Sequence, residues 1–191
     1  MSSFQRLLKF IDFTHQLQQV KRIVNVRHEE RKENDMEHMY QLAMVAWYIA
    51  EEQNLPLDKN KIIVYALVHD VVEGYAGDTF FYHRSAAESL DKAKREAEAI
   101  EKLRIEFPEF PQMHELIRAY ELRADPESRF VYAFDKVLPV LNIYLDNGRT
   151  WKEHDITLQM LVDGKKNNVA VSPEIKPYFD ELIQILEKNH A

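Results

Sequence analysis

Two adjacent residues, His69 and Asp70, carry the side chains in this sequence that are best suited to chemistry. They follow an unbroken apolar run over residues 62–68, where an unpaired carboxylate or imidazolium would be costly to bury, so such groups usually pair or bind a metal. His38 and Asp135 lie far from this pair in the sequence, each in another apolar segment. Together the four side chains offer two imidazoles and two carboxylates. This donor set suits one divalent cation, namely Mn, Co, Fe, Zn, Ni or Mg.

Two acidic residues follow the pair. Glu73 lies one helical turn after His69, where its carboxylate can take or donate a proton, or orient a water made acidic by the cation. Asp78 has two readings, because it could be a second acid of the site or the cap of the next helix. Taken singly, His38 also fits a hydrogen-bonded core histidine, and Asp135 fits a structural ion-pair partner. The four types in combination favour a metal site.

The elements that must position these residues are predicted to be helices, because apolar residues recur at helical spacing and no useful strand-like alternation is present. We expect Asp35 and Asp58 to cap helices, and Pro126 to occupy the first turn of another. Residues 21–34 are expected to be irregular and residues 163–172 to form a flexible loop. The expected helices cover residues 4–20, 36–52, 59–72, 86–107, 113–122, 126–145, 151–161 and 173–189.

The candidate ligands lie beside the apolar stripes of three of these helices. His38 aligns with Leu42, and His69 aligns with Tyr65, at a spacing of four residues that puts each pair on one helix face. Asp135 is aligned with apolar neighbours in the same way. We therefore expect three helices to present polar groups to a common interior point.

Composition limits the remaining function classes. A chain of 191 residues suits a single domain, and no segment rich in Pro, Gly or Ser suggests a boundary within residues 1–191. The chain has no Cys, so a thiolate site is excluded. We expect no membrane segment and a cytoplasmic location, because no apolar run approaches the about 20 residues needed to span a bilayer. The formal charge of −7 disfavours long nucleic acid as a partner but allows a small phosphate ester, held by a metal and one or two Arg.

Beyond the four candidate ligands, three segments carry a family resemblance: residues 33–38 (ENDMEH), 69–78 (HDVVEGYAGD) and 134–136 (FDK). Over about residues 4–145 the chain resembles the HD-domain metal-dependent phosphohydrolases, and within them the 5′-deoxynucleotidase-like branch. The resemblance implies an all-α HD-domain helical bundle with the C-terminal helices packed on it. It also implies one divalent metal held by His38, His69, Asp70 and Asp135. Glu73 would handle the attacking water or assist the leaving group, and Asp78 would contact the substrate or assist proton transfer.

This branch also uses an Arg near the end of the first helix to hold phosphate, followed directly by a Trp that shapes the sugar pocket. Arg22 is the nearest match, although an ordinary surface position is an equal reading, and Arg27 and Arg31 are weaker alternatives. Ile23 stands where the Trp is expected, which puts discrimination against ribose in doubt. Since members of the branch often form dimers, a homodimer is a further expectation, with residues 80–82 (FFY) either an interface or part of the core.

The function implied is hydrolysis of a small phosphorylated substrate, a nucleoside or deoxynucleoside 5′-monophosphate. One alternative is a guanosine alarmone pyrophosphohydrolase, since that branch also reads His-Asp-Val-Val-Glu. Those enzymes continue with an Asp, where this chain has Gly74. Another alternative is a non-catalytic HD protein that binds a metal or a nucleotide, and the blandest is a purely structural helical bundle that binds no metal.

Overall fold

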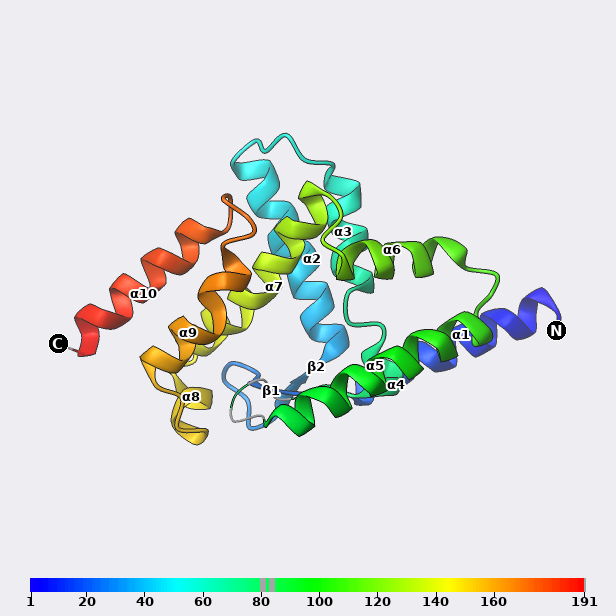
Figure 1. The fold of residues 1–191 in the computed structure, drawn as a ribbon, viewed down its shortest axis with the longest axis horizontal. Helices are drawn as coiled ribbons and strands as arrows, with labels where there is room; N and C mark the ends of the chain where they lie inside the picture. The colour runs from blue at the N-terminus through cyan, green and yellow to red at the C-terminus, as the bar shows by residue number, and fades with distance from the viewer. Residues whose placement is uncertain (80–81, 83–84, 191) are drawn as a thin grey trace.

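The computed structural model of the protein describes residues 1–79, 82 and 85–190 (Figure 1). The described residues form helices and one short hairpin, so the predicted all-α class is confirmed. In chain order the elements are α1 (Ser3–Gln19), β1 (Lys21–Asn25), β2 (Lys32–Asn34), α2 (Asp35–Glu52), α3 (Lys59–Val68), α4 (Glu73–Ala76), α5 (Ala86–Glu106), α6 (Pro111–Glu121), α7 (Pro126–Leu145), α8 (Arg149–Glu153), α9 (Leu158–Val169) and α10 (Lys176–His190). Within the described part of the chain, no helix is both long enough and apolar enough to cross a bilayer.

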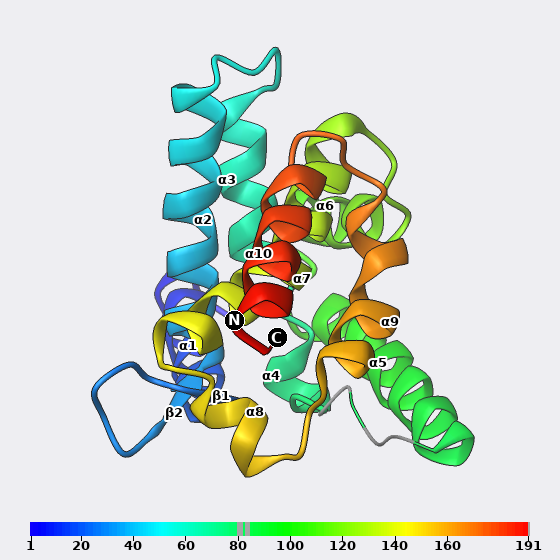
Figure 2. The same ribbon diagram turned by 90° about the vertical axis from the view of Figure 1, so that its left-hand side faces the viewer.

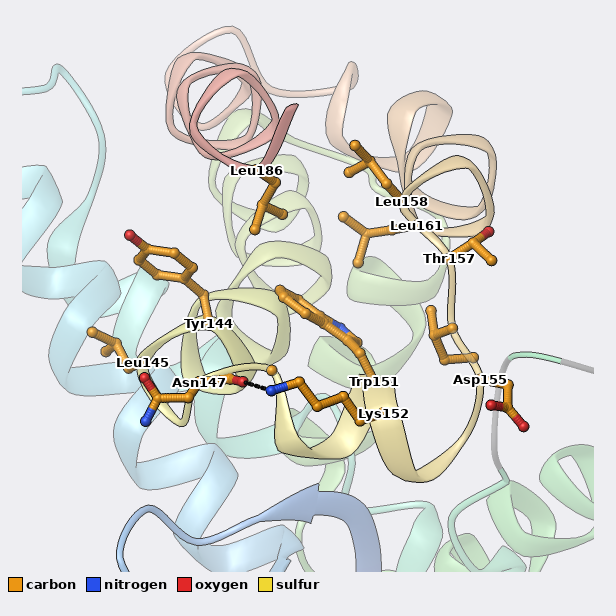
Figure 3. A pocket seen from close by; sticks show the side chains of 12 residues that line it. Tyr144, Leu145, Asn147, Trp151, Lys152, Asp155, Thr157, Leu158, Leu161 and Leu186 are labelled. Atoms are coloured by element: carbon orange, nitrogen blue, oxygen red, sulfur yellow. Dashed lines mark hydrogen bonds between the residues drawn. The ribbon is translucent and has the colours of Figure 1, made fainter. Parts of the chain in front are cut away.

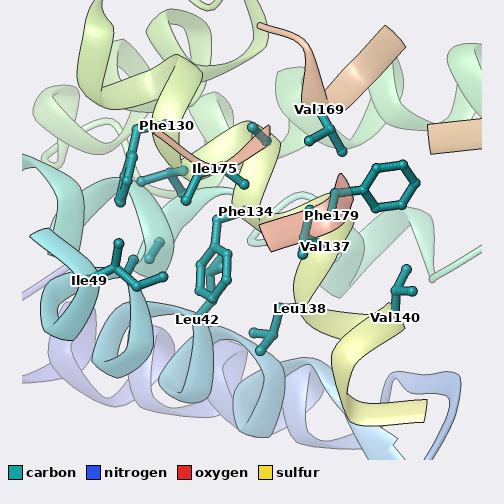
Figure 4. Close-up of a cluster of buried hydrophobic side chains, with 14 of the residues drawn as sticks. Leu42, Ile49, Phe130, Phe134, Val137, Leu138, Val140, Val169, Ile175 and Phe179 are labelled. Atoms are coloured by element: carbon teal, nitrogen blue, oxygen red, sulfur yellow. The ribbon is translucent and has the colours of Figure 1, made fainter. Parts of the chain in front are cut away.

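Two clusters of buried apolar side chains hold the helices together. The larger one joins α2, α3, α7, α9 and α10, with Leu42, Phe134 and Ile175 among its members (Figure 4). The second joins α1, α4, α5 and α6 around Phe13 and Phe107. In Figure 2, α2 and α3 run side by side, and α10 lies across the side of the molecule that faces the viewer. The two clusters meet along α2 and α3, the helices that carry the candidate histidines.

The segment 21–34 is a hairpin, so the expectation of an irregular stretch was wrong. Its two strands pair antiparallel, with Lys21 opposite Asn34 and Asn25 opposite Lys32. The strands have five and three residues, which is too short for an alternating pattern to stand out in the sequence. The hairpin matters for function because it brings Arg22 against the body of the helices.

The predicted caps divide into one confirmed and one wrong. Asp58 caps α3 as predicted, because its side chain accepts a hydrogen bond from the backbone N–H of Lys61. At α2 the cap is Asn34, whose side chain accepts from the backbone N–H of Glu37 at 3.1 Å, while Glu37 accepts from the Asn34 N–H at 3.0 Å. This reciprocal pair satisfies the helix start, and the carboxylate of Asp35 is left to face the interior.

The C-terminal third differs from the expected pattern. Instead of one helix over 151–161 there are two, α8 and α9, and Thr157 caps the second by accepting from the Met160 N–H at 3.2 Å. The segment 163–172 is not a flexible loop, because most of it belongs to α9. The polar residues that suggested a loop lie between Leu161 and Val169 in the sequence. These two apolar residues are buried, and their spacing of eight residues puts them on one face of the helix. Of the aromatic segment 80–82, residues 80 and 81 lie outside the described residues.

Candidate metal centre

The fold brings the four candidate ligands to one point. His38 lies on α2, His69 and Asp70 follow the last turn of α3, and Asp135 lies in the middle of α7. His38 Nε2 is 3.0 Å from Asp135 Oδ1, and His69 Nε2 is 3.0 Å from Asp70 Oδ2 and 3.6 Å from Asp135 Oδ1. One ligand atom from each of the four residues lies within 4.8 Å of the others. The predicted set is therefore assembled in space.

The far sides of both imidazoles face oxygen atoms. The Nδ1–H of His69 donates to the carbonyl oxygen of Ala66 at 2.9 Å, which turns Nε2 toward the cluster. His38 Nδ1 lies 3.4 Å from Glu33 Oε1. The hydrogen bond to Ala66 is of the kind that orients a metal-binding imidazole and raises its basicity.

The donor set fits a divalent cation by its chemistry and by one unsatisfied atom. His69 Nε2 is buried, and the carboxylate oxygens close to it are not placed to form a hydrogen bond with it. Burial alone would lower the pKa of His69, but the nearby carboxylates of Asp70 and Asp135 raise it to about 10. The cluster therefore attracts positive charge, as a proton on the imidazole or as a metal ion. Two imidazoles with two carboxylates suit a borderline to hard ion.

Two further acids, Asp35 and Glu73, lie near Asp70 of the cluster. Asp35, Asp70 and Glu73 have oxygens within 4.8 Å of one another. Burial, then the charges of Asp70 and Asp78, raises the pKa of Glu73 well above its ordinary value, and Glu73 Oε2 is buried without a hydrogen-bond partner. Burial and the charge of Asp70 likewise raise the pKa of Asp35 to about 7. A carboxyl group that binds a proton more strongly than usual is thus held at the edge of the candidate metal site.

Asp78 lines the cavity beside the cluster, which is described below, and it caps none of the helices in the described part of the chain. Ser85 caps α5 instead, because its side chain accepts from the backbone N–H of Glu88 at 3.2 Å. Burial raises the pKa of Asp78, against the opposing charge of Arg22. The capping interpretation of Asp78 was therefore wrong, and the position agrees with the alternative of an acid in the site.

Arg22 is the arginine that the fold places at the cluster. Its guanidinium donates to Asp70 Oδ2 at 2.7 Å and to Asp35 Oδ1 at 3.3 Å, while its Nε is buried without a hydrogen-bond partner. Arg27 is exposed, and Arg31 is exposed and paired with acidic side chains on the surface. Of the three arginines considered, Arg22 alone lines the cavity described next.

The cluster opens into a cavity of about 370 Å³. Its lining includes four acidic side chains, those of Asp70, Glu73, Asp78 and Asp135. Arg22 and Ile23 from β1 also line it. Sequence reasoning missed several other lining residues, which come from α5, α7, α8 and α9: Lys92, Lys136, Thr150, Trp151, Lys165 and Asn168.

Two signals in the sequence could have found some of the missed residues. Lys136 directly follows Asp135, and its ammonium group lies 2.6 Å from Asp135 Oδ2. Lys165 shares the helical spacing of Leu161 and Val169, which marks the inward stripe of α9. No local signal identifies Trp151, because the position of α8 beside β1 is a matter of tertiary packing.

A larger hollow of about 840 Å³ lies beside α7, α8, α9 and α10 (Figure 3). Tyr144, Trp151 and Leu186 contribute to its walls, and Lys152 donates to the carbonyl oxygen of Asn147 at 3.0 Å at its edge. Its described lining contains no histidine, and Asp155 is its one carboxylate. It shares Trp151 with the smaller cavity, but Asp70 and Asp135, the two carboxylates of the candidate metal cluster, line only the smaller one.

Comparison with known proteins agrees with this geometry. The family model of the HD domain matches residues 14–176, a range that includes all four candidate ligands. The chain belongs to the HD-domain family. The match confirms the resemblance carried by His38, His69, Asp70 and Asp135.

Relatives of known name are similar to this chain over most of its length. The chain is 32% identical to the 5′-deoxynucleotidase HDDC2 of Homo sapiens over 141 residues, which cover 71% of this chain and 65% of the human protein. The protein of the same name from Mus musculus is also 32% identical, with 67% of its length covered. The match thus spans just under two thirds of the human relative.

One solved structure is similar to this protein over nearly its whole length. The crystal structure of a predicted metal-dependent phosphohydrolase from Magnetospirillum magnetotacticum superposes with a TM-score of 0.83 at 26% identity, covering 98% of this chain and 97% of that one. A conserved hypothetical protein from Pyrococcus furiosus shares the fold, with a TM-score of 0.63 and 20% identity.

Proposed function

We propose that this HD-domain protein is a metal-dependent phosphohydrolase that removes the phosphate from nucleoside or deoxynucleoside 5′-monophosphates. The observation that carries the proposal is the cluster of His38, His69, Asp70 and Asp135, whose two carboxylates line a cavity that also contains basic side chains. The names of the relatives, 5′-deoxynucleotidase and metal-dependent phosphohydrolase, support the same reaction class. We propose one divalent ion at the cluster, chosen from Mn, Co, Mg, Zn, Fe and Ni.

The formal charges of the cavity support a phosphate monoester as substrate. Its described lining contains four acidic side chains and four basic ones, Arg22, Lys92, Lys136 and Lys165. These formal charges cancel, so a divalent cation would leave an excess of two positive charges. A phosphate monoester carries a charge of about −1.5 to −2 at pH 7. The site with its metal would therefore match the charge of one phosphate group.

The residues have distinct parts in the proposed reaction. The cation would make its bound water more acidic and polarise the phosphoryl group. Glu73 accepts a proton from the attacking water as the water oxygen forms a bond to phosphorus. The ester bond between phosphorus and the 5′ oxygen breaks, and Asp78, whose pKa is raised by burial, relays the proton taken up by Glu73 to that oxygen. Arg22 donates to the phosphate oxygens, where charge must be stabilised.

The apolar part of the cavity supports a nucleoside as the leaving group. Ile23, Ile143 and Trp151 line the cavity together with the acidic and basic side chains. A volume of about 370 Å³ falls in the range of about 300–1,000 Å³ usual for small-molecule sites. Because Ile23 is smaller than the Trp expected from the resemblance, we propose that the site accepts ribonucleotides as well as deoxyribonucleotides.

A nucleotide panel tests this function. The protein is stripped of metal with a chelator and assayed with each of the six divalent ions against ribo- and deoxyribonucleoside 5′-monophosphates, with released orthophosphate as the readout. A guanosine alarmone is added as a further substrate, since pyrophosphate release from it would favour the alarmone alternative. Metal and nucleotide binding without turnover would favour the non-catalytic alternative. No release of either product with any ion would contradict the proposed function.

Assembly and location are separate proposals. We propose a homodimer, which light scattering of the purified protein would test. We also propose a cytoplasmic location, which fractionation of the source cells would test.

A further inference from the structure

Lys165 is a basic residue of the cavity that takes no part in the reaction steps proposed above. It lies on α9, on the same stripe as Leu161 and Val169, and its side chain lines the cavity next to the metal cluster. The next residue, Lys166, points the other way, because its side chain is 57% exposed and lies 3.4 Å from Asp163. Lys165 and Lys166 are therefore adjacent on one helix, but only Lys165 lines the cavity.

The surroundings of Lys165 disfavour its charged form. Burial and the charge of Lys136 lower the pKa of Lys165 to about 8. The charge of Arg22 acts in the same direction, although Asp135 opposes it. The ammonium group also lies 5.9 Å from the centre of the Tyr82 ring. Arg22, Lys136 and Lys165 thus bring positive charge from β1, α7 and α9 to one cavity, where Arg22 pairs with Asp70 and Lys136 pairs with Asp135. An anion bound beside Lys165 would favour its charged form.

We propose that Lys165 binds the phosphate group of the substrate from α9, as a second basic contact in addition to Arg22. The inference rests on the proposed function, since the phosphate in question is that of the nucleotide. A lysine suits this position because its ammonium group is a compact charge on a flexible stem that can follow the phosphate. The C-terminal helices thereby become part of the substrate site.

Binding of inorganic phosphate tests this inference without relying on turnover. Isothermal titration calorimetry measures the orthophosphate Kd of the Mn-loaded and the metal-free full-length protein. Neutral variants Lys165→Met and Lys165→Gln should each raise the Kd about tenfold to a hundredfold, as expected for loss of a hydrogen bond to a charged group. Lys165→Arg should restore most of the affinity. The matched control, Lys166→Met, removes the same charge one position away and should leave the Kd unchanged.

A kinetic readout separates phosphate binding from a structural effect. For a nucleotide that the wild-type protein hydrolyses, the neutral Lys165 variants should raise KM by more than they lower kcat, while circular dichroism melting curves stay close to that of the wild type. Their KM should also depend less on salt, since one charge contact is gone.

The outcomes distinguish this inference from the proposed function. Equal orthophosphate affinity of the Lys165 and Lys166 variants overturns the role of Lys165, and so does failure of the wild-type protein to bind phosphate. Hydrolysis of nucleotides by the wild-type protein would leave the proposed function standing in either case. Conversely, a selective loss of phosphate affinity in the Lys165 variants, with no nucleotide hydrolysed by the wild type, would support the anion site and overturn the proposed function.

Discussion

The imidazole of His38 and the carboxylate of Asp135 lie 3.0 Å apart across the interface of α2 and α7, although 97 residues separate them in the sequence. Both side chains are buried, His38 completely. Asp135 Oδ1 is also 3.6 Å from His69 Nε2, so one carboxylate oxygen faces both imidazoles. Buried carboxylates cost free energy unless their negative charge is balanced, and a divalent cation bound between the carboxylates and the imidazoles would balance it.

Removal of one ligand should abolish metal binding. Asp135→Asn keeps the size of the side chain but removes its charge, so we expect the Mn content after dialysis to fall from about one ion per chain to near zero. Activity should fall by more than the 10–100-fold that is typical for an outer partner of a metal ligand. Elemental analysis and phosphate release measure the two effects. Asp163→Asn, at an exposed position on α9, is the matched control. Full metal retention by Asp135→Asn would count against the proposed ligand set.

Loss of the proposed proton acceptor should affect turnover alone. In Glu73→Gln the amide cannot take a proton from water, and general base catalysis is typically worth 10²–10⁴-fold. We therefore expect kcat to fall by about that factor, while Mn content and the unfolding midpoint stay close to wild type. Glu98→Gln, whose parent side chain is 67% exposed on α5, should leave kcat unchanged. A Glu73→Gln variant with wild-type kcat would exclude Glu73 from the proton transfer.

Metal affinity should depend on pH. The carboxylates of Asp70 and Asp135 raise the pKa of His69 to about 10, so below that pH the metal-free imidazole carries a proton that the cation must displace. The apparent affinity for Mn should therefore fall as the pH is lowered, by up to roughly tenfold per pH unit for each proton displaced. Titrations at several pH values would measure this, and an affinity that is constant over the neutral range would contradict it.

Gly74 should matter for packing between α1 and α4. A Cβ at this position would lie 2.9 Å from Phe13 Cε2 and 3.2 Å from Leu17 Cδ2. Overpacking costs about 1–3 kcal/mol, against a gain of about 1 kcal/mol for Ala over Gly in a helix, so Gly74→Ala should lower the free energy of unfolding by about 1 kcal/mol. Urea unfolding measures this. The cost should shrink in a Phe13→Leu background, because the ring atom that the Cβ meets is gone, and equal costs in both backgrounds would show that the ring is not the cause.

The residue after Arg22 should control the choice between ribose and deoxyribose. Ile23 lines the cavity, and the resemblance places a sugar-shaping Trp at this position. We expect Ile23→Trp to lower kcat/KM for ribonucleotides more than for deoxyribonucleotides, because the larger ring fills space near the sugar. Competition assays with matched nucleotide pairs would measure the ratio. An unchanged ratio would mean that Ile23 lies away from the sugar.

Much of the fold was predictable because its signals are local. The long helices α1, α2, α5 and α7 lie within a few residues of their predicted bounds, since each has an apolar stripe at helical spacing. The hairpin and the pair α8 and α9 were not predicted, since short strands and short helices give weak patterns. The cap at Asn34 was missed because Asn34 and Asp35 are both good caps and only the path of the chain from β2 decides between them.

The candidate ligands and the family were predictable from the sequence, because His38, His69, Asp70 and Asp135 stand in segments whose residue types are distinctive. Which other groups line the cavity depends on how elements distant in the sequence pack together. Arg22 reaches Asp70 because a hairpin folds against the helices, and Lys165 faces the cavity while Lys166 faces solvent because α9 packs on α7 through Leu161 and Val169. The physical reason is that helical periodicity fixes which residues share a face, whereas the packing of distant helices decides what that face meets.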